Sequence, residues 1–407
     1  MISKSPFSSQ ERRAVSSLAI LYVLRMLGLF MVLPLLAVYA IDMPGATPAS
    51  IGLALGIYGL TQALLQIPLG WLSDVIGRKP VIIAGLLVFA VGSVIAAQAD
   101  DVATIVLGRA LQGAGAIAST VMALVADLTR PDQRTKAMAV VGVSIGASFA
   151  LALVLGPAVA SFSGLAGVFW FTALLALAGI ATVVLRIPHV GPMQGGTEVI
   201  PRGALLGRSL RRPELARLNF GVFCLHFILM ACFLTVPGYL EQTLGVERGD
   251  HWIVYLIALL VSVAGMLPLL TLGERGGMPK QMLLLAISLI LVALALLGLV
   301  TSTALFYLGL CLFFVGFNYL EATLPSLVSR AVAADGRGTA MGVFSTSQFF
   351  GAFAGGALGG WALQLFGPPG LLILCFGLGI AWLMLAARAP LPVEQESEPA
   401  QAGLSES

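Results

Sequence analysis

Twelve long apolar stretches, separated by short polar gaps, constrain the fold of this chain more than any other feature. A helix needs about 20 mostly apolar residues to cross the hydrocarbon core of a bilayer. Stretches such as LLLAISLILVALALLGLV show none of the alternation that is typical of a membrane-spanning strand. We therefore predict an all-α membrane protein with twelve transmembrane helices, which begin near residues 14, 50, 80, 103, 136, 165, 217, 251, 280, 304, 337 and 369.

The amino-acid composition excludes the water-soluble and the disordered classes of protein. Apolar residues make up 58% of the chain and charged residues only 10%, whereas a soluble domain is about 25% charged. Disordered chains are rich in charge and poor in apolar residues. The four cysteines all lie in apolar stretches, where we expect buried free thiols.

The distribution of lysine and arginine predicts the orientation of the helices. With the N-terminus in the cytoplasm, 19 of the 22 basic residues fall in cytoplasmic loops and tails, and only Arg248 falls outside. The other two, Arg25 and Arg109, lie within helices. This bias follows the positive-inside rule and places both termini in the cytoplasm. It also accounts for the net charge of +3 without a nucleic-acid partner.

The two halves of the chain are related by an offset of 203 residues. RTKAMAVVGVS from Arg134 aligns with RGTAMGVFSTS from Arg337, and the same offset relates Pro34 to Pro237 and Gly156 to Gly359. Parallel repeats are typical of transporters whose substrate site lies between the repeats. We predict pseudo-symmetric six-helix bundles over 1–187 and 217–389, a cytoplasmic linker over 188–216, and a polar, disordered tail over 390–407.

The short loop after the second apolar stretch, GWLSDVIGRKP, is the most informative motif. It holds one acid, Asp74, two bases, Arg78 and Lys79, and two glycines, Gly70 and Gly77. Gly77 can adopt the positive φ of a tight turn, and Asp74 can pair with Arg78. A simple positive-inside anchor would explain the two bases but not the aspartate.

This loop resembles the signature of the major facilitator superfamily, G-x-L-x-D-x-x-G-R-K. RALQGAGA, which contains Arg109 and Gln112, resembles the second motif of the family, and Gly156 with Pro157 resembles the end of its antiporter motif. Three positions where glycine is common in that last motif hold other residues here: Ala152, Ala160 and Ser161. The whole sequence is similar to bacterial drug:H⁺ antiporters of the family, which implies a bacterial inner-membrane location.

The resemblance implies alternating access by rocking of the two halves, with the first, fourth, seventh and tenth helices around a central cavity. It also implies that Asp74 and Arg78 form a cytoplasmic gate, with Asp127 as a third partner. The second repeat has Gly273 but no acid at the position of Asp74, so the gate is asymmetric.

Four ionisable residues within the apolar stretches are candidates for transport chemistry, because a charge in the bilayer is costly. Glu321 and His226 are the proposed proton carriers, and each has the alternative of a structural hydrogen bond or ion pair. Arg25 must face a cavity or pair, either with Glu321 or with an anionic substrate. Arg109 either takes part in proton coupling or braces its own half.

Uncharged polar residues and glycines complete the candidate site. Tyr58, Gln62 and Gln66 are spaced four apart and share one helix face, where they either line a cavity or tie helices together. Gln112 and Asn318 are further candidates for the cavity. Glycine stripes indicate close helix packing, and they comprise Gly52 and Gly56 in the second helix and Gly351, Gly355 and Gly359 in the eleventh.

The sequence predicts a transporter rather than an enzyme. It contains no Gly-Lys dipeptide, so ATP cannot bind to a Walker A loop, and no metal or other cofactor is expected. We predict proton-coupled export of small drug-like organic molecules by a monomer. The alternatives are export or facilitated diffusion of a sugar, an organic anion or another metabolite, which Arg25 favours over a cationic drug, and more remotely a membrane-embedded sensor.

Overall fold

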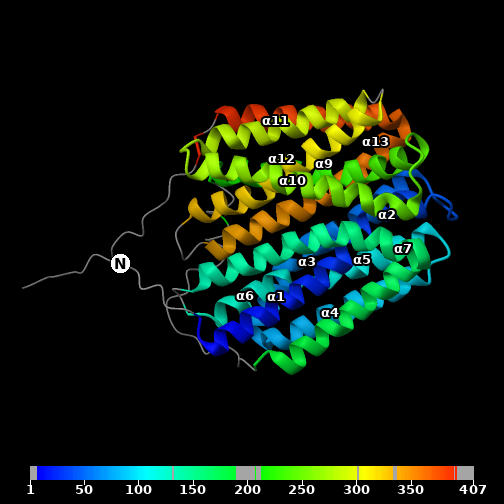
Figure 1. Cartoon of the computed structure of the whole chain (residues 1–407). Helices are drawn as coiled ribbons and strands as arrows, with labels where there is room; N and C mark the ends of the chain where they lie inside the picture. Colours follow the sequence, from blue (N-terminus) through cyan, green and yellow to red (C-terminus); the bar gives the residue numbers. More distant parts are fainter. Residues whose placement is uncertain are drawn as a thin grey trace, which may run out of the picture.

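The computed structural model of the chain describes residues 7–130, 133–188, 207, 212–299, 302–332, 337–388 and 390–391. In these ranges it is a bundle of long helices (Figure 1). Ten of the described helical stretches are long and apolar enough to cross a membrane. The tail from 392 onward and most of the linker that the sequence predicts lie outside the described residues.

Within the described residues, the first half of the chain contains seven helices. They are α1 (Ser9–Phe30), α2 (Leu33–Tyr39), α3 (Pro48–Ile76), α4 (Arg78–Ala97), α5 (Val102–Ala114), α6 (Ala118–Asp127) and α7 (Arg134–Arg186). The second half contains α9 (Pro213–Gln242), the short η1 (Arg248–Asp250), α10 (His251–Glu274), α11 (Pro279–Gly298), α12 (Thr303–Arg330) and α13 (Arg337–Arg388). Helix α9 thus includes residues 213–216, which the sequence assigns to the linker.

Two helices, α7 and α13, turn back on themselves in the middle (Figure 1). The turns lie at Gly164, with φ 64°, and at Gly367, with φ 68°. Positive φ is readily adopted only by glycine, and the two glycines are again 203 positions apart. If each of these helices is counted as two crossings, the ten stretches give the twelve that the sequence predicts.

Polar caps start several helices outside the apolar stretches. Ser8 and Glu11 form a reciprocal capping box at the start of α1, and Thr47 caps α3. The carboxylate of Asp101 accepts a hydrogen bond of 2.7 Å from the backbone N–H of Thr104 at the start of α5. Such caps satisfy backbone N–H groups that a helix leaves free at its first turn.

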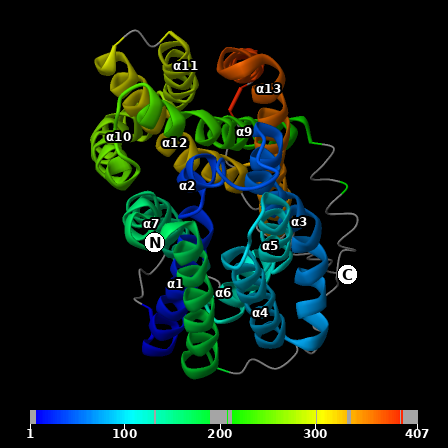
Figure 2. The same ribbon diagram turned by 90° about the vertical axis from the view of Figure 1, so that its right-hand side faces the viewer.

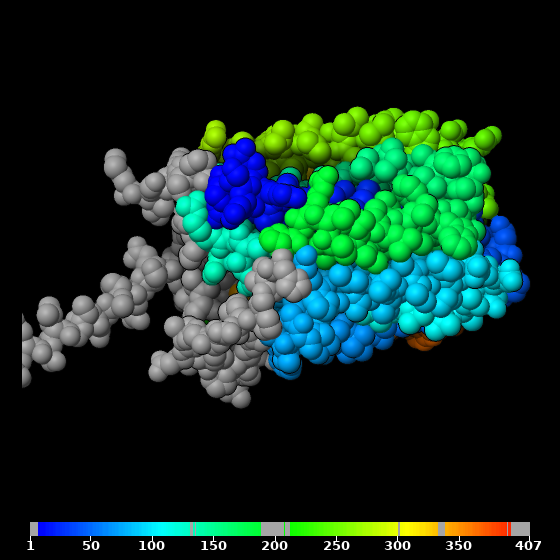
Figure 3. Space-filling model, turned by 90° about the horizontal axis from the view of Figure 1, so that it is seen from below, coloured from blue at the N-terminus to red at the C-terminus, as the bar shows by residue number. Residues whose placement is uncertain are grey.

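The helices form two groups, one from each half of the chain (Figure 2). Helices α1 and α3–α7 form the first group, α9–α13 form the second, and α2 lies where the groups meet, against α7 and α9. Helix α10 of the second half runs beside the first part of α7 (Figure 3). Helices α3 and α13 pack closely across the boundary.

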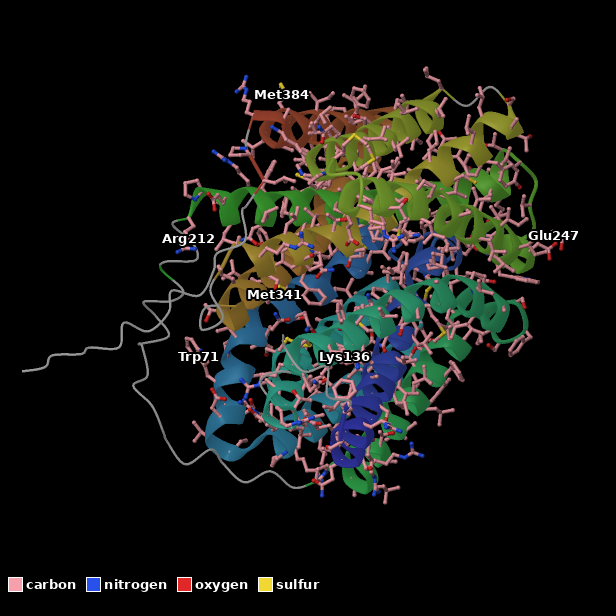
Figure 4. The ribbon with its side chains drawn as sticks, turned by 60° about the vertical axis from the view of Figure 1, so that its left-hand side comes forward. Trp71, Lys136, Arg212, Glu247, Met341 and Met384 are labelled. Carbon is pink, nitrogen blue, oxygen red and sulfur yellow. The ribbon has the colours of Figure 1, made fainter. Side chains whose placement is uncertain are left out.

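The two ends of the bundle differ in charge. We call the end near Arg78, Lys136 and Arg212 the basic end, and the end near Asp42 and Glu247 the acidic end. Figure 4 shows Arg212 at one side of the bundle and Glu247 at the opposite side.

The halves are joined most closely toward the acidic end. There the backbone N–H of Ala49 donates to Gln364 over 3.3 Å, and Arg248 approaches Asp42 at 3.5 Å. A Cβ on Gly356 of α13 would lie 2.5 Å from the carbonyl oxygen of Gly52 on α3. The glycine stripes of α3 and α13 therefore allow the backbones of the two halves to touch.

The halves are less closely packed at the basic end. Val75 in the last turn of α3 is 73% exposed. A Cβ added to Gly142 of α7, or to Gly338 or Gly342 of α13, would meet nothing within 4 Å. At these described positions the basic end has none of the close backbone approaches between the halves that Gly52 and Gly356 make at the acidic end.

We expect Gly356→Val to open the acidic end, because the new side chain would collide with the α3 backbone. Overpacking of this kind typically costs about 1–3 kcal/mol, which would move the ratio of closed to open molecules about tenfold. Spin labels at Ile41→Cys and Glu247→Cys would report the separation of the halves. Gly342→Val on the same helix, where a Cβ meets open space, is the control, and equal behaviour of the two variants would contradict the packing role.

Candidate functional site

A titratable pair lies inside the second half, where three helices meet. His226 of α9 and Glu321 of α12 approach within 3.6 Å, from Nε2 to Oε2. The side-chain amide nitrogen of Gln348 on α13 lies 2.8 Å from His226 Nε2 and 3.2 Å from Glu321 Oε1. The two proton carriers that the sequence predicts are therefore brought together, and an uncharged side chain connects them.

The hydrogen bonds define the protonation state that this geometry fits. His226 Nδ1 faces the carbonyl oxygen of Val222 at 3.1 Å. A carbonyl can only accept, so Nδ1 carries the hydrogen and Nε2 of the neutral ring accepts from Gln348. The second amide hydrogen of Gln348 is then available to the carboxyl oxygen Oε1 of Glu321. The side chain of Glu321 is 33% exposed and that of His226 is 10% exposed.

Asn318 shares the helix of Glu321 but not its contacts. Its amide donates to the hydroxyl of Ser262 on α10 over 2.8 Å, which ties α12 to α10. Next to it, the ring of Phe317 lies 6.0 Å from that of His226 and 5.5 Å from that of Phe149 on α7. The titratable pair is thus separated from the first half by aromatic side chains on this side.

Arg25 is 1% exposed inside the first half. Its Nη2 donates to Gln62 Oε1 and to the carbonyl oxygen of Gly115, each at 2.9 Å, and its guanidinium lies over the ring of Phe89. Among the residues that the structure describes, its Nε and Nη1 have no hydrogen-bond partner. The predicted alternative of an Arg25–Glu321 pair is therefore wrong for this structure, because each residue bonds within its own half.

The break between α5 and α6 explains the choice of partner. Helix α5 ends at Ala114, and Gly115 has the non-helical ψ of 42°. Carbonyl groups in the last turn of a helix have no intrahelical partner. The carbonyl of Gly115 is free for this reason and accepts from Arg25.

Arg109 of α5 is fully buried in the same half. Its Nη1 donates to Gln112 over 2.9 Å and its Nε to the carbonyl oxygen of Ala54 over 3.3 Å. The guanidinium lies 5.0 Å from the centre of the Tyr58 ring, a cation–π contact. Gln112 in turn donates to Ser93 over 2.8 Å, so this network links α3, α4 and α5.

The polar stripe of α3 is buried and ties helices together. Tyr58 donates to Gln62 Oε1 over 3.3 Å, and the amide of Gln62 donates to Gln66 over 3.3 Å. Ser119 of α6 donates to the backbone carbonyl of Gln66. Of the two alternatives for this stripe, these contacts favour helix tying over the lining of an open cavity.

The signature loop forms a compact cluster at the basic end. Arg78 pairs with Asp74 at 2.5 Å and with Asp127 at 3.0 Å, and also donates to Ser73 over 2.6 Å. Gly77 has φ 97° between α3 and α4. All of these residues belong to the first half.

The glycines of the other motifs lie at close backbone approaches. A Cβ on Gly156, next to Pro157 in α7, would lie 2.5 Å from the carbonyl oxygen of Met31, between α1 and α2. A Cβ on Gly70 would lie 3.0 Å from the hydroxyl of Ser119. The antiporter-like motif therefore holds α7 against the junction of α1 and α2.

One sequence motif that is associated with hydrolases lies in a different setting here from the one that a hydrolase needs. The segment 142–146, GVSIG, has the spacing of a hydrolase nucleophile elbow, which needs a turn between a strand and a helix. Ser144 instead lies inside α7 and donates to the carbonyl oxygen of Val140. Across the described ranges, no group of three or more His, Cys, Asp or Glu residues could hold a metal ion.

Long apolar helices in two repeats, with buried ionisable side chains, define a multi-pass membrane protein of the transporter class. The family profile "Major Facilitator Superfamily" matches residues 18–356. The chain belongs to this superfamily.

Curated relatives of the chain are bacterial transporters. It is 47% identical over 388 residues to the inner membrane transport protein YajR of Escherichia coli, covering 94% of this chain and 84% of YajR. It is 26% identical over 377 residues to the multidrug resistance protein MdtH of Aeromonas salmonicida, covering 90% and 93%. The chain is accordingly a multi-pass transporter of a bacterial inner membrane.

Solved structures share the fold at low sequence identity. The human organic anion transporter MFSD10 (TETRAN) has a TM-score of 0.69 at 22% identity and covers 93% of this chain and 100% of its own. A mutant of the nucleoside transporter NupG has a TM-score of 0.71 at 16% identity and covers 92% and 99%.

Proposed function

We propose that this transporter exports small organic, drug-like molecules in exchange for protons, by alternating access. The observation that supports the proposal most is the His226–Gln348–Glu321 cluster. Histidine changes its charge near neutral pH, and a carboxylate beside it can share or release a proton. The name of the MdtH relative, a multidrug resistance protein, supports the class of substrate.

The proposed mechanism uses the difference between the two ends. If the basic end lies in the cytoplasm, as the positive-inside rule predicts, the close contacts at the acidic end would correspond to a closed outer end in an inward-facing form. Asp74, Arg78 and Asp127, with Gly70, Gly77 and Lys79 around them, would form a cytoplasmic gate when the halves rock together. In the present form the ion pairs of Arg78 with Asp74 and Asp127 lie within the first half.

Arg109 is proposed to support proton coupling across the boundary between the halves. Its guanidinium lies over Tyr58, and Tyr58 contacts Phe349, the residue after Gln348. The network of Arg25, Tyr58, Gln62, Gln66 and Gln112 would then hold the first half rigid around the transport path.

An organic anion is the second candidate for the substrate. Arg25 and Arg109 are buried, their partners are amides and carbonyls, and three of their N–H-bearing nitrogens have no hydrogen-bond partner in the described structure. An anion reaching these groups in another state of the cycle would supply the opposite charge. MFSD10, which shares the fold, is named an organic anion transporter.

Proton flux in proteoliposomes tests the proposal. The wild-type protein would be placed under an imposed pH gradient and exposed in turn to cationic, neutral and anionic compounds. We expect compounds of one charge class to trigger proton movement across the membrane down the imposed gradient. Protein-free liposomes are the control. If a compound crosses the membrane without any proton movement, the protein works by facilitated diffusion and the antiport proposal is wrong.

A further inference from the structure

Gln348 connects the titratable pair to the helix that forms the boundary between the halves. Its amide nitrogen bridges His226 and Glu321. The next residue, Phe349, lies with its ring 6.3 Å from that of Tyr58 on α3. A Cβ on Gly59 of α3 would meet the carbonyl oxygen of Phe349. Of these two successive residues of α13, Gln348 therefore faces the pair and Phe349 faces the opposite half.

Proton binding by His226 is incompatible with the present position of this amide. Nδ1 already donates to Val222, so an added proton goes to Nε2. Nε2 would then become a donor, facing the donor nitrogen of Gln348 at 2.8 Å. The bridge must break, or the amide must turn.

Turning the amide satisfies His226 only when Glu321 changes as well. The amide oxygen would accept from protonated His226 but would also face Glu321 Oε1, which is itself an acceptor while the carboxylate is ionised. With a proton on Glu321, one amide oxygen can accept from both groups. One orientation of the Gln348 amide thus fits neutral His226 with ionised Glu321. The other orientation fits the pair when His226 and Glu321 have each bound a proton.

We propose that Gln348 is a positioning residue that couples proton binding at His226 and Glu321 to the contact between the halves, given the proton-coupled transport proposed above. Its amide turns or withdraws when the pair is protonated. Because Gln348 and Phe349 are neighbours on one helix, this change acts directly on the contact with Tyr58 and Gly59.

The helices packed around the pair carry further titratable side chains. Between its terminal residues Arg337 and Arg388, α13 carries no charged side chain. The nearest part of the first half presents Tyr58, with Arg109 over its ring. The helices packed around the pair also carry Cys224 and Cys232 on α9, Tyr255 on α10, Tyr307, Cys311 and Tyr319 on α12, and Cys375 on α13. Nearer the ends of the same helices lie Glu214, Arg217, Tyr239 and Glu241 on α9, His251 and Glu274 on α10, and Arg330 on α12.

The test measures how pH changes the conformation without any substrate. Spin labels at Val75→Cys on α3 and Leu272→Cys on α10, with the four native cysteines replaced by alanine, would report the opening of the basic end in purified full-length protein between pH 5 and pH 8.5. We expect the open fraction of the otherwise wild-type protein to depend on pH. Gln348→Leu should abolish that dependence.

Matched variants separate this role from a simple packing role. Gln364→Leu changes the other glutamine of α13, which bonds to Ala49 of the opposite half away from the pair, and should keep the wild-type pH dependence. Gln348→Glu has the same shape and adds a titrating donor, so it should keep a pH dependence whose midpoint moves by about one pH unit or more. If Gln348→Leu does not fold, Gln348→Glu alone still tests the role of Gln348.

The results distinguish failure of the inference from failure of the proposed function. If Gln348→Leu retains the wild-type profile, or Gln348→Glu has an unmoved midpoint, while Glu321→Gln loses its pH dependence, the role of Gln348 is overturned and proton coupling stands. If Glu321→Gln and His226→Gln both keep the wild-type profile, the proposal that His226 and Glu321 bind the protons is wrong.

Discussion

Replacing Glu321 by glutamine is expected to abolish proton-driven transport while leaving exchange of the transported compound intact. Glutamine keeps the shape of the side chain and its reach to Gln348, but it cannot bind and release a proton. Loss of a positioned acid–base group typically costs about a hundredfold or more in rate. Compound-triggered proton flux in proteoliposomes should fall by that factor, whereas exchange without a gradient needs no net proton transfer and should persist.

The control for this experiment is Glu274→Gln. Glu274 is an exposed carboxylate at the end of α10 in the same half, so its loss should leave proton flux unchanged. Equal flux in the wild type and in Glu321→Gln would remove Glu321 as a carrier. Loss of both flux and exchange would instead point to a structural role for the carboxylate.

Arg78→Leu is expected to lower the free energy of unfolding by about 2–3 kcal/mol. The arginine is the shared partner of Asp74 and Asp127, and all three side chains are at most 24% exposed. Its removal leaves two carboxylates close together, one of them at the unfavourable C-terminal end of α6. Unfolding of the purified protein in detergent would measure the loss.

Two further substitutions show whether the loss of stability comes from the ion pairs of Arg78. Arg275→Leu removes an exposed base from the loop after α10 in the second repeat and should change stability little. Arg78→Lys keeps the charge but loses the planar donors that reach both carboxylates, so an intermediate loss is expected. If Arg78→Leu is no less stable than Arg275→Leu, the ion-pair cluster contributes nothing measurable.

The helices were largely predictable because each apolar stretch is as long as a bilayer is thick. Their ends were less so, because polar caps such as Ser8, Thr47 and Asp101 lie outside the apolar stretches and extend the helices beyond them. Helix α9 begins at Pro213 for a similar reason: proline suits a first helical turn. The turns at Gly164 and Gly367 were not foreseen as positive-φ positions, although they share the repeat offset.

The candidate site was predictable in its charged members but not in its connections. His226 and Glu321 are conspicuous because ionisable residues are rare in apolar helices. Gln348 was missed because an uncharged amide among small polar residues gives no such signal, and only packing of α9, α12 and α13 brings it to the pair. The partner of Arg25 was missed because the sequence draws attention to opposite charges, whereas the backbone carbonyl of Gly115 is freed by a helix break.

The enclosure of α9 has a consequence for biogenesis. Of the most apolar 18-residue window of this helix, 89% is buried inside the protein, against 28% for α10. Synthesis delivers α9 to the membrane before α10–α13 exist, so at that moment only helices of the first half, such as α2 and α3, are available to cover it. Most of the cover of α9 comes from α13 of its own half, so we expect this helix to stay largely uncovered until the end of the chain has been made.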